Sequence, residues 1–309
     1  MKIVIEIEEP YNLDLTMKPS FLSSLYEKVN GWWIKKIGFL AGSFKLKQEG
    51  NFLIAEYNGD LDYKMFIDEV KLESGLWHNP FEHYLGNLSK KVRESVSQLS
   101  KMFPGVRLAI SPRDFNLIFI GALLSKRTRY EVFVKKWFHR LWSSFRCDFK
   151  VIANLSLREL SIIGSSYQIF HLKRTLKDYL ALYGDKIMLN ESSFILRRKL
   201  MYCWGVGPKV ADATLLFTRQ EPEILPVDTH LVKATRCFNW VDKFKLPTKN
   251  LCLKYVCNEN ESKLLKLPIC PLSLNNLCLR KQLTEIFGKL SGWIQTLTYL
   301  AGSKIKRYS

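Results

Sequence analysis

The 309-residue chain has no hydrophobic run long enough to cross a lipid bilayer. Its longest stretch without a charged residue, Leu290–Ser303, is fourteen residues long, whereas a spanning helix needs about 20. Glu6 and Glu8 lie where a secretory signal would need an apolar core. We therefore expect an intracellular protein, in the cytoplasm and nucleoid or in the nucleus, with no membrane partner.

The seven cysteines form no recognisable framework. An odd number of cysteines without a secretory signal argues against a set of disulfides. The last four have the spacing C-x4-C-x12-C-x7-C, which matches no zinc or iron–sulfur pattern. We therefore expect buried thiols and no metal site, and the sequence assigns no role to Cys252, Cys257, Cys270 and Cys278.

Acidic residues are scarce in the last two-thirds of the chain. Only 15 Asp and Glu follow Pro104, against 34 Lys and Arg, whereas the first 104 residues have 14 and 13. The net charge of +18 therefore comes wholly from the residues after Pro104. A basic excess of this size indicates a polyanionic partner, nucleic acid before membrane. The alternative is a charge that serves only solubility.

The first hundred residues are typical of a β-rich domain. Ile3, Ile5 and Ile7 alternate with more polar residues, which predicts a strand with one buried face. Short strands and short turns favour an antiparallel sheet. Further strands are predicted at residues 31–36, 39–47 and 52–57, and helices at 63–73 and 88–102.

From residue 105 onward the apolar residues recur at three- and four-residue spacing, which predicts an almost wholly helical chain. Only residues 241–276 lack a clear pattern. The sequence thus predicts an α+β fold, with a β-rich domain at 1–104 and a helical region at 105–309. Helices are predicted at 113–125, 130–145, 157–163, 166–183, 193–203, 208–219, 228–238, 277–287 and 292–301.

Residues 200–212 (LMYCWGVGPKVAD) predict two helices joined by a tight turn. Gly205 and Gly207 permit positive φ values and leave backbone N–H groups uncovered. Pro208 suits the first position of the next helix, so these N–H groups lie at a helix N-terminus. Such a site binds anions and can hold a DNA phosphate without reading a base. An ordinary helix–helix turn explains the two glycines equally well.

Lys209 and Asp228 add chemistry to this turn. A cation in the first turn opposes the helix dipole, so a purely structural sequence would favour an acid at position 209. The same field would lower the pKa of the ammonium group and leave more free amine as a nucleophile. Asp228 precedes an apolar helix, and one interpretation is that it serves only as the N-cap of that helix. The other is that it deprotonates the lysine and stabilises positive charge on a sugar ring.

Residues 205–212 (GVGPKVAD) and 226–230 (PVDTH) resemble the helix–hairpin–helix (HhH-GPD) DNA glycosylase superfamily, and within it the 8-oxoguanine DNA glycosylase/AP lyase group. Residues 103–108 (FPGVRL) and 287–295 (FGKLSGWIQ) resemble the same group, and the resemblance is strong over 103–300. The β-rich residues 1–104 resemble the N-terminal domain of this group more loosely. It implies a monomeric base-excision-repair enzyme that flips 8-oxoguanine out of duplex DNA, excises it and cleaves the strand by β-elimination. It also implies two helical subdomains with the DNA cleft between them.

The resemblance also implies roles for particular residues. Lys209 would form the Schiff base, and Asp228 would be its catalytic partner. No redox cofactor or divalent metal is needed, although a monovalent cation often lies at the hairpin in this family. Backbone phosphate would be bound by Gly205, Val206, Gly207 and His230, and the base would be contacted by Pro226, Gln295 and Tyr299. The alternative for His230 is an ordinary residue in the first turn of a helix.

Gln295 and Tyr299 also support base recognition on physical grounds. They are four residues apart and therefore share one helix face. An amide offers a donor and an acceptor to the Watson–Crick edge of guanine, and a ring one turn away can stack on the extruded base. The alternative is that both belong to the helix core. The family usually has phenylalanine where Tyr299 stands.

Three segments depart from the family pattern. Residues 21–25 (FLSSL) lack the glycine whose carbonyl accepts the N7–H of 8-oxoguanine. The asparagine-rich segment that fills the gap in the duplex is replaced by residues 126–129 (KRTR). Arg127 is expected to fill the gap and contact the orphaned base, or else to be a solvated charge. Ser165 and Ser166 follow Gly164, where the family commonly has a tyrosine wedge.

Other functions remain open at this point. A lyase of the endonuclease III type normally carries a C-terminal Cys-x6-Cys-x2-Cys-x5-Cys cluster, which this sequence lacks. A monofunctional alkylpurine glycosylase lacks the lysine of the motif. The alternatives that remain are a glycosylase/AP lyase for another damaged base and a non-catalytic DNA-binding protein.

Overall fold

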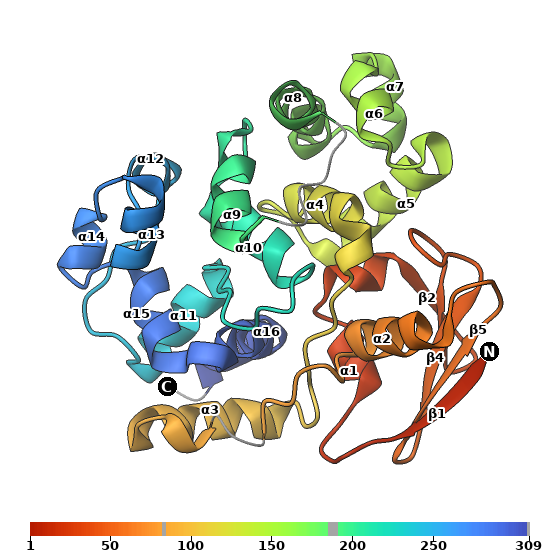
Figure 1. Cartoon of the computed structure of the whole chain (residues 1–309), viewed down its shortest axis with the longest axis horizontal. Helices are drawn as coiled ribbons and strands as arrows, with labels where there is room; N and C mark the ends of the chain where they lie inside the picture. The colour runs from red at the N-terminus through yellow and green to blue at the C-terminus, as the bar shows by residue number, and fades with distance from the viewer. Residues whose placement is uncertain (82–84, 185–190, 308–309) are drawn as a thin grey trace. The chain divides into compact units, whose positions relative to one another are not determined.

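A computed structural model describes residues 1–81, 85–184 and 191–307 (Figure 1). The contacts divide the chain into two compact units. The sheet unit contains Met1–Arg113, Leu216–Leu246 and Asn276–Ser309. The hairpin unit contains Asp114–Leu215 and Pro247–Asn275. These units differ from the division expected at residues 104 and 105, because the C-terminal helices pack with the N-terminal residues.

The sheet unit confirms the predicted α+β class, with five antiparallel strands and helices after them. Strand β1 lies at one edge and pairs with β5, so that Ile5 faces Leu53. From that edge the order is β1 (Lys2–Glu6), β5 (Phe52–Tyr57), β4 (Phe44–Glu49), β3 (Trp32–Lys35) and β2 (Tyr26–Val29).

The strand expected at residues 39–47 begins only at Phe44. The prediction was wrong for its first residues because Gly38, Leu40 and Gly42 have φ values of 90°, 64° and 81°. These left-handed conformations form turns and interrupt a strand. Strand β2 and the short helix α1 (Leu13–Met17) were not predicted.

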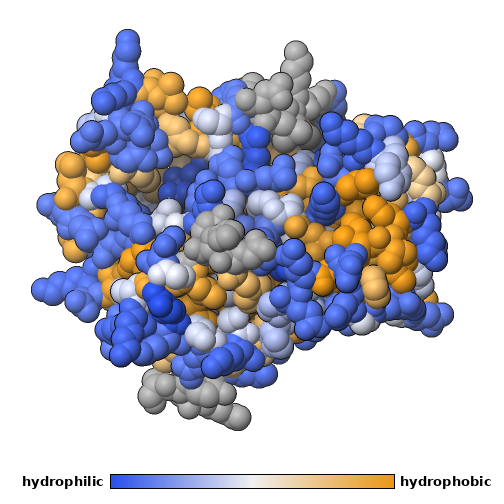
Figure 2. Space-filling model, turned by 60° about the horizontal axis from the view of Figure 1, so that its bottom comes forward, coloured by the Kyte–Doolittle hydropathy of each residue, from blue (hydrophilic) through white to orange (hydrophobic). Residues whose placement is uncertain are grey.

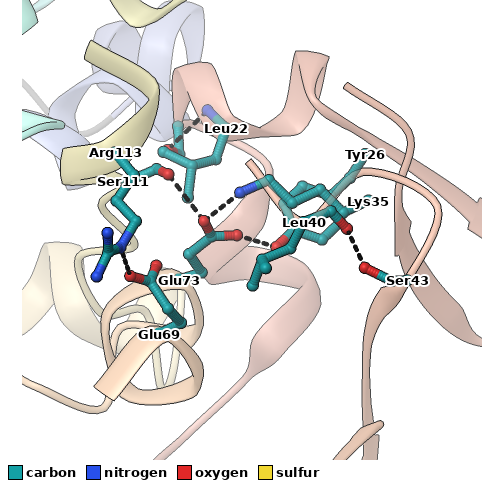
Figure 3. Close-up of polar contacts among 10 residues, drawn as sticks. Leu22, Tyr26, Lys35, Leu40, Ser43, Glu69, Glu73, Ser111 and Arg113 are labelled. Carbon is teal, nitrogen blue, oxygen red and sulfur yellow. Dashed lines mark hydrogen bonds and ion pairs between the residues drawn. The ribbon is translucent and has the colours of Figure 1, made fainter. Parts of the chain in front are cut away.

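Helix α2 (Tyr63–Ser74) packs against one face of the sheet, where the ring of Phe66 contacts Phe44 and Tyr57. The same interface buries a polar cluster around Glu73 (Figure 3). The carboxylate of Glu73 accepts hydrogen bonds from Lys35, Tyr26 and Ser111. A buried charge that is paired and bonded in this way fixes how helix and sheet meet.

The other helices of the sheet unit pack against α16 (Ser291–Ala301), whose Trp293 side chain is fully buried. Its indole Nε1 donates to the carbonyl of Val106 at 2.8 Å, so residues near 106 belong to the core of this unit. Exposed hydrophobic residues of this unit include Val4 on β1 and Phe52 on β5. Figure 2 shows a hydrophobic patch on the face of the protein turned towards the viewer. The helices are α3 (Lys90–Met102), α11 (Thr229–Phe238), α15 (Leu279–Phe287) and α16 (Ser291–Ala301).

The hairpin unit is built around α4 (Phe115–Leu124), which is buried along its whole length apart from Asn116. The predicted helices of this unit are confirmed, although residues 130–134 form one wide π turn and α6 was not predicted. They are α5 (Lys135–Phe145), α6 (Phe149–Asn154), α7 (Leu157–Ile163), α8 (Tyr167–Tyr183), α9 (Ser193–Tyr202) and α10 (Pro208–Leu216).

Within the patternless segment 241–276, three short helices belong to the hairpin unit. They are α12 (Lys249–Lys254), α13 (Glu259–Leu265) and α14 (Pro271–Leu274). Arg198 of α9 holds this segment, because its guanidinium donates to the carbonyls of Cys252, Leu253 and Tyr255 at 2.6–3.0 Å. Helices of four to seven residues are too short to show a clear hydrophobic period, which explains why no apolar pattern predicted them.

Candidate active site

The turn between α9 and α10 forms the predicted hairpin. Gly205 adopts φ 73°, a conformation that favours glycine, and Val206 is fully buried beneath the turn. The φ of Gly207 lies outside the left-handed region, so only Gly205 is needed as a glycine for the backbone geometry. A Cβ on Gly207 would meet nothing within 4 Å, and this glycine instead leaves the approach to the start of α10 open.

Lys209 lies in the first turn of α10, as predicted. Its Nζ donates to the hydroxyl of Ser125 at 2.9 Å, and that hydroxyl donates to the carbonyl of Ala122 at 2.8 Å. Ser125 follows the last residue of α4, so a neutral oxygen at the end of a buried helix holds the amine in place. This arrangement suits a lysine that must present its amine at a fixed position.

The carbonyls of the hairpin are covered by side-chain donors. Lys249 Nζ donates to Cys203 at 2.8 Å, Thr175 Oγ1 to Trp204 at 2.8 Å and Lys126 Nζ to Gly205 at 3.2 Å. Burial, and then the charge of Lys209, lowers the pKa of Lys126. Neither Lys126 nor Lys249 was predicted to have a functional role.

A row of aromatic and basic side chains on α8 continues from the hairpin. Trp204 packs edge-on against His171 at 4.5 Å, and Arg174 lies over the Trp204 ring at 4.6 Å. Tyr167, which is exposed, contacts His171 at 5.1 Å. Burial, and then the charges of Lys126 and Arg174, lowers the pKa of His171. Tyr167, His171 and Arg174 are four and three residues apart and share one face of α8. This spacing is the sequence signal that could have identified the surface.

Asp228 caps α11 in the sheet unit and contacts the predicted base-recognition residue Gln295. Its Oδ1 accepts from the backbone N–H of Leu231 at 2.8 Å, and its Oδ2 accepts from Gln295 Nε2 at 3.1 Å. Gln295 is 7% exposed, so its amide is held in the interior of this unit rather than in solvent. The N-cap explanation of Asp228 is therefore confirmed, and a functional role is compatible with it.

His230 and Tyr299 lie together beside this pair. Their rings contact edge-on at 5.4 Å, and both side chains are half-buried. Pro226, also predicted to contact the base, is buried two residues before Asp228. The sheet unit thus brings together Asp228, His230, Gln295 and Tyr299, whereas Lys209, Gly205, Val206 and Gly207 lie in the hairpin unit.

The structure also describes the segments that depart from the family pattern. Arg127 is exposed and has φ 51°, and its gap-filling role stays a prediction. Residues Phe21–Ser24 form a single 3-10 turn, and the Phe21 ring packs edge-on against Phe217 at 5.2 Å. Ser165 is exposed before α8, where the next aromatic side chain is Tyr167.

The described part of the chain contains neither a metal-binding cluster nor a membrane span. All seven cysteines are free thiols, and no group of three or more His, Cys, Asp or Glu side chains among the described residues could hold a metal ion. No described helix is both long and apolar enough to cross a bilayer.

Comparison with known proteins places the fold. No family model and no curated protein matches the sequence. Solved structures match over nearly the whole chain. The structure of MBOgg1 in complex with a low-affinity DNA ligand has a TM-score of 0.68 at 18% identity, over 99% of this chain and 96% of that one. The chain has the helix–hairpin–helix DNA glycosylase fold.

Two further structures share this fold. Clostridium acetobutylicum 8-oxoguanine glycosylase/lyase, in complex with dsDNA containing cytosine opposite 8-oxoG, has a TM-score of 0.66 at 17% identity, over 98% of this chain and 96% of that one. The 3-methyladenine DNA glycosylase from Archaeoglobus fulgidus has a TM-score of 0.63 at 15% identity, over 97% of both chains. One fold therefore serves glycosylases for different bases, so residues rather than fold must identify the substrate.

Proposed function

We propose that this chain is a bifunctional DNA glycosylase/AP lyase that removes an oxidised purine, chiefly 8-oxoguanine, from duplex DNA. The observation that carries the proposal is the position of Lys209, in the first turn of α10 beside the glycine hairpin, with its amine held by Ser125. A structural lysine has no reason to lie against the positive end of a helix dipole. The +18 net charge supports a DNA partner.

In the proposed reaction the damaged nucleotide is flipped out of the duplex. The neutral amine of Lys209 attacks C1′ of its sugar, and the bond from C1′ to the base breaks as the base leaves with the electron pair. Asp228 accepts the lysine proton and stabilises positive charge that develops on the sugar. Opening of the sugar ring gives the imine between Lys209 and C1′.

Strand cleavage follows from this imine. Loss of a proton from C2′ pushes electrons into the imine and breaks the bond between C3′ and its phosphate oxygen. The phosphate is the leaving group, and water later releases Lys209 from the unsaturated sugar. Gln295 and Tyr299 are proposed to contact the base, and Gly205, Val206, Gly207 and His230 to hold the backbone.

Borohydride trapping tests this proposal, because reduction makes the imine permanent. The substrate is a duplex with one 8-oxoguanine opposite cytosine, and Lys209→Gln and Lys209→Arg are run beside the natural chain. The arginine variant keeps the positive charge and so separates loss of the nucleophile from loss of DNA binding. We expect an adduct with the natural chain and none with either variant.

The other outcomes identify the alternatives. An adduct with an abasic site but not with 8-oxoguanine would retain the lyase and reject the base assignment. A different damaged base is favoured as the second candidate by one observation, the absence of a glycine from the 3-10 turn at Phe21–Ser24. A panel of duplexes with other lesions would find it. DNA binding without any adduct would leave a non-catalytic DNA-binding protein.

A further inference from the structure

Three consecutive carbonyl oxygens of the hairpin accept hydrogen bonds from side chains of distant segments. Those of Cys203 and Gly205 accept from the ammonium groups of Lys249 and Lys126, at 2.8 Å and 3.2 Å. The carbonyl between them, of Trp204, accepts from the hydroxyl of Thr175 at 2.8 Å. The hairpin thus has two built-in positive charges bound to its backbone oxygens.

These contacts decide whether a monovalent cation fits the hairpin. Sodium and potassium ions are held in proteins by rings of backbone carbonyl oxygens. An ion that used the carbonyl oxygens of Cys203 and Gly205 would have to displace the ammonium groups from them and remain close to both groups. Like charges at such short range repel strongly in a partly buried site. The residues present therefore do not fit the cation that the family resemblance implies.

We propose that Lys126 and Lys249 replace the monovalent cation of the hairpin, so that this protein binds a DNA phosphate there without a metal ion. The proposal rests on the proposed function, since DNA is the ligand. An ammonium group has three N–H donors, so a bond to a carbonyl leaves it able to bond a phosphate oxygen as well. The two lysines then supply the charge that an ion would otherwise supply beside the N-terminus of α10.

Lys126 is fixed on the side of the hairpin nearest Lys209. It directly follows Ser125, which binds the Lys209 amine, and its own carbonyl accepts from Gln168 Nε2 at 2.7 Å. A Cβ on Gly205 would lie 3.3 Å from Lys126 Nζ, so the glycine also makes room for the ammonium group. The side chain is half-buried, as expected of a group built into the turn.

Lys249 reaches the hairpin from the segment that had no sequence pattern. It is the first residue of α12, whose C-terminal carbonyls are held by Arg198. Burial lowers the pKa of Lys249, in keeping with an ammonium group that contacts protein on one side. The segment 247–275 therefore has a function in this proposal, because it carries the second cation to the turn.

An ion-replacement experiment tests the inference on the natural chain. Affinity for a duplex with a tetrahydrofuran abasic analogue, which the enzyme cannot cleave, is measured by fluorescence anisotropy at constant ionic strength. The salts are sodium, potassium and tetramethylammonium chloride, the last having a cation too large for carbonyl ligation. We expect dissociation constants that agree within about twofold in the three salts. An affinity at least about tenfold lower in tetramethylammonium, restored by potassium, would overturn the proposal.

Variants give an independent measurement. Lys126→Met and Lys249→Met are each expected to weaken DNA binding about five- to tenfold. In each variant the slope of the logarithm of the binding constant against the logarithm of the salt concentration should be smaller by about one. Lys126→Arg should retain most of the affinity. The matched control is Lys263→Met, which removes an exposed charge of α13 in the same segment and should change binding by less than about twofold. Equal binding by Lys126→Met and the natural chain would contradict the proposal.

Failure of the two proposals can be distinguished. If the natural chain binds no duplex in any of the three salts, the proposed function fails. If it binds and forms the borohydride adduct only when sodium or potassium is present, the glycosylase proposal stands and the replacement of the cation is wrong. Thermal unfolding of each variant shows whether weakened binding reflects a loss of folding.

Discussion

The amide of Gln295 donates to Oδ2 of Asp228 at 3.1 Å, which joins the proposed base-recognition residue to the proposed catalytic carboxylate within the sheet unit. A carboxylate only accepts hydrogen bonds, so the amide nitrogen of Gln295 must face it. The amide oxygen then faces away and is an acceptor. This orientation offers an acceptor to an N–H donor on the Watson–Crick edge of a base, such as the N1–H of an oxidised guanine.

We expect Gln295→Glu to reduce borohydride trapping at neutral pH by at least about tenfold. The substitution places a second carboxylate against Asp228, and two such groups repel unless one of them holds a proton. Trapping should therefore recover partly as the pH falls towards 5. Gln295→Met, which loses the hydrogen bond without adding charge, is the control and should show no such recovery. A Gln295→Glu profile parallel to that of the natural chain would contradict the expectation.

The two hairpin glycines should respond differently to alanine. Gly205 has φ 73° and is close to Lys126, so Gly205→Ala should lower the free energy of unfolding by about 1 kcal/mol or more. Gly207 has open space around it, so Gly207→Ala should fold with nearly unchanged stability. Its methyl group would nevertheless cover the approach to α10, and we expect about tenfold weaker DNA binding. Urea unfolding and anisotropy measure the two effects, and unchanged DNA affinity in Gly207→Ala would argue against phosphate binding at this turn.

Arg197 and Asp212 form a buried ion pair between α9 and α10. Arg197 donates from two nitrogens to the two carboxylate oxygens, at 2.6 Å and 3.1 Å. Arg197→Met removes the counter-ion of a buried carboxylate and should cost about 3–5 kcal/mol of stability. The double variant Arg197→Met/Asp212→Leu should recover much of this loss. Chemical unfolding measures both, and equal losses in the single and double variants would show that packing, not charge, is responsible.

His78 should make the protein less stable in mild acid. Burial, together with the nearby charges of Arg107 and Lys289, lowers its pKa from 6.5 to about 4. The unfolded chain therefore binds a proton below about pH 6.5 that the folded chain refuses until about pH 4, so stability falls across this window as the pH decreases. Between pH 7 and pH 5 we expect a loss of about 2 kcal/mol from this residue.

The measurement is urea unfolding of the natural chain and of His78→Gln at both pH values. The glutamine variant cannot take up the proton, so its stability should depend less on pH by about the same 2 kcal/mol. An identical pH dependence of the two proteins would assign the acid sensitivity to other groups.

Sequence periodicity was sufficient for most of the fold and for the parts of the site that lie within one segment. The hairpin and the helices that it joins follow from two glycines, a proline and apolar spacing. Asp228 as an N-cap follows in the same way, since the bond that it accepts comes from Leu231, three residues on. Such local features depend on propensities that a sequence displays directly.

Relationships between distant segments could not be predicted in this way. Lys249 and Cys203 are 46 residues apart, and Lys126 and Gly205 are 79 apart, so no local pattern relates them. The helix that carries Lys249 is six residues long and shows no hydrophobic period. The strand predicted from residue 39 shows a different limit. An apolar pattern was present there, but three residues in left-handed conformations prevent the strand from starting before Phe44.

The path of the chain has a consequence for dividing the protein. The backbone passes from one compact unit to the other at residues 113–114, 215–216, 246–247 and 275–276. Neither unit is therefore a continuous stretch of sequence, and no single cut yields two complete halves. Truncation after residue 215 would keep Lys209 and the whole hairpin but would remove Lys249. A chimera made by one genetic crossover would not exchange the complete hairpin unit with that of a relative. The exchanged piece would have to include both residues 114–215 and residues 247–275.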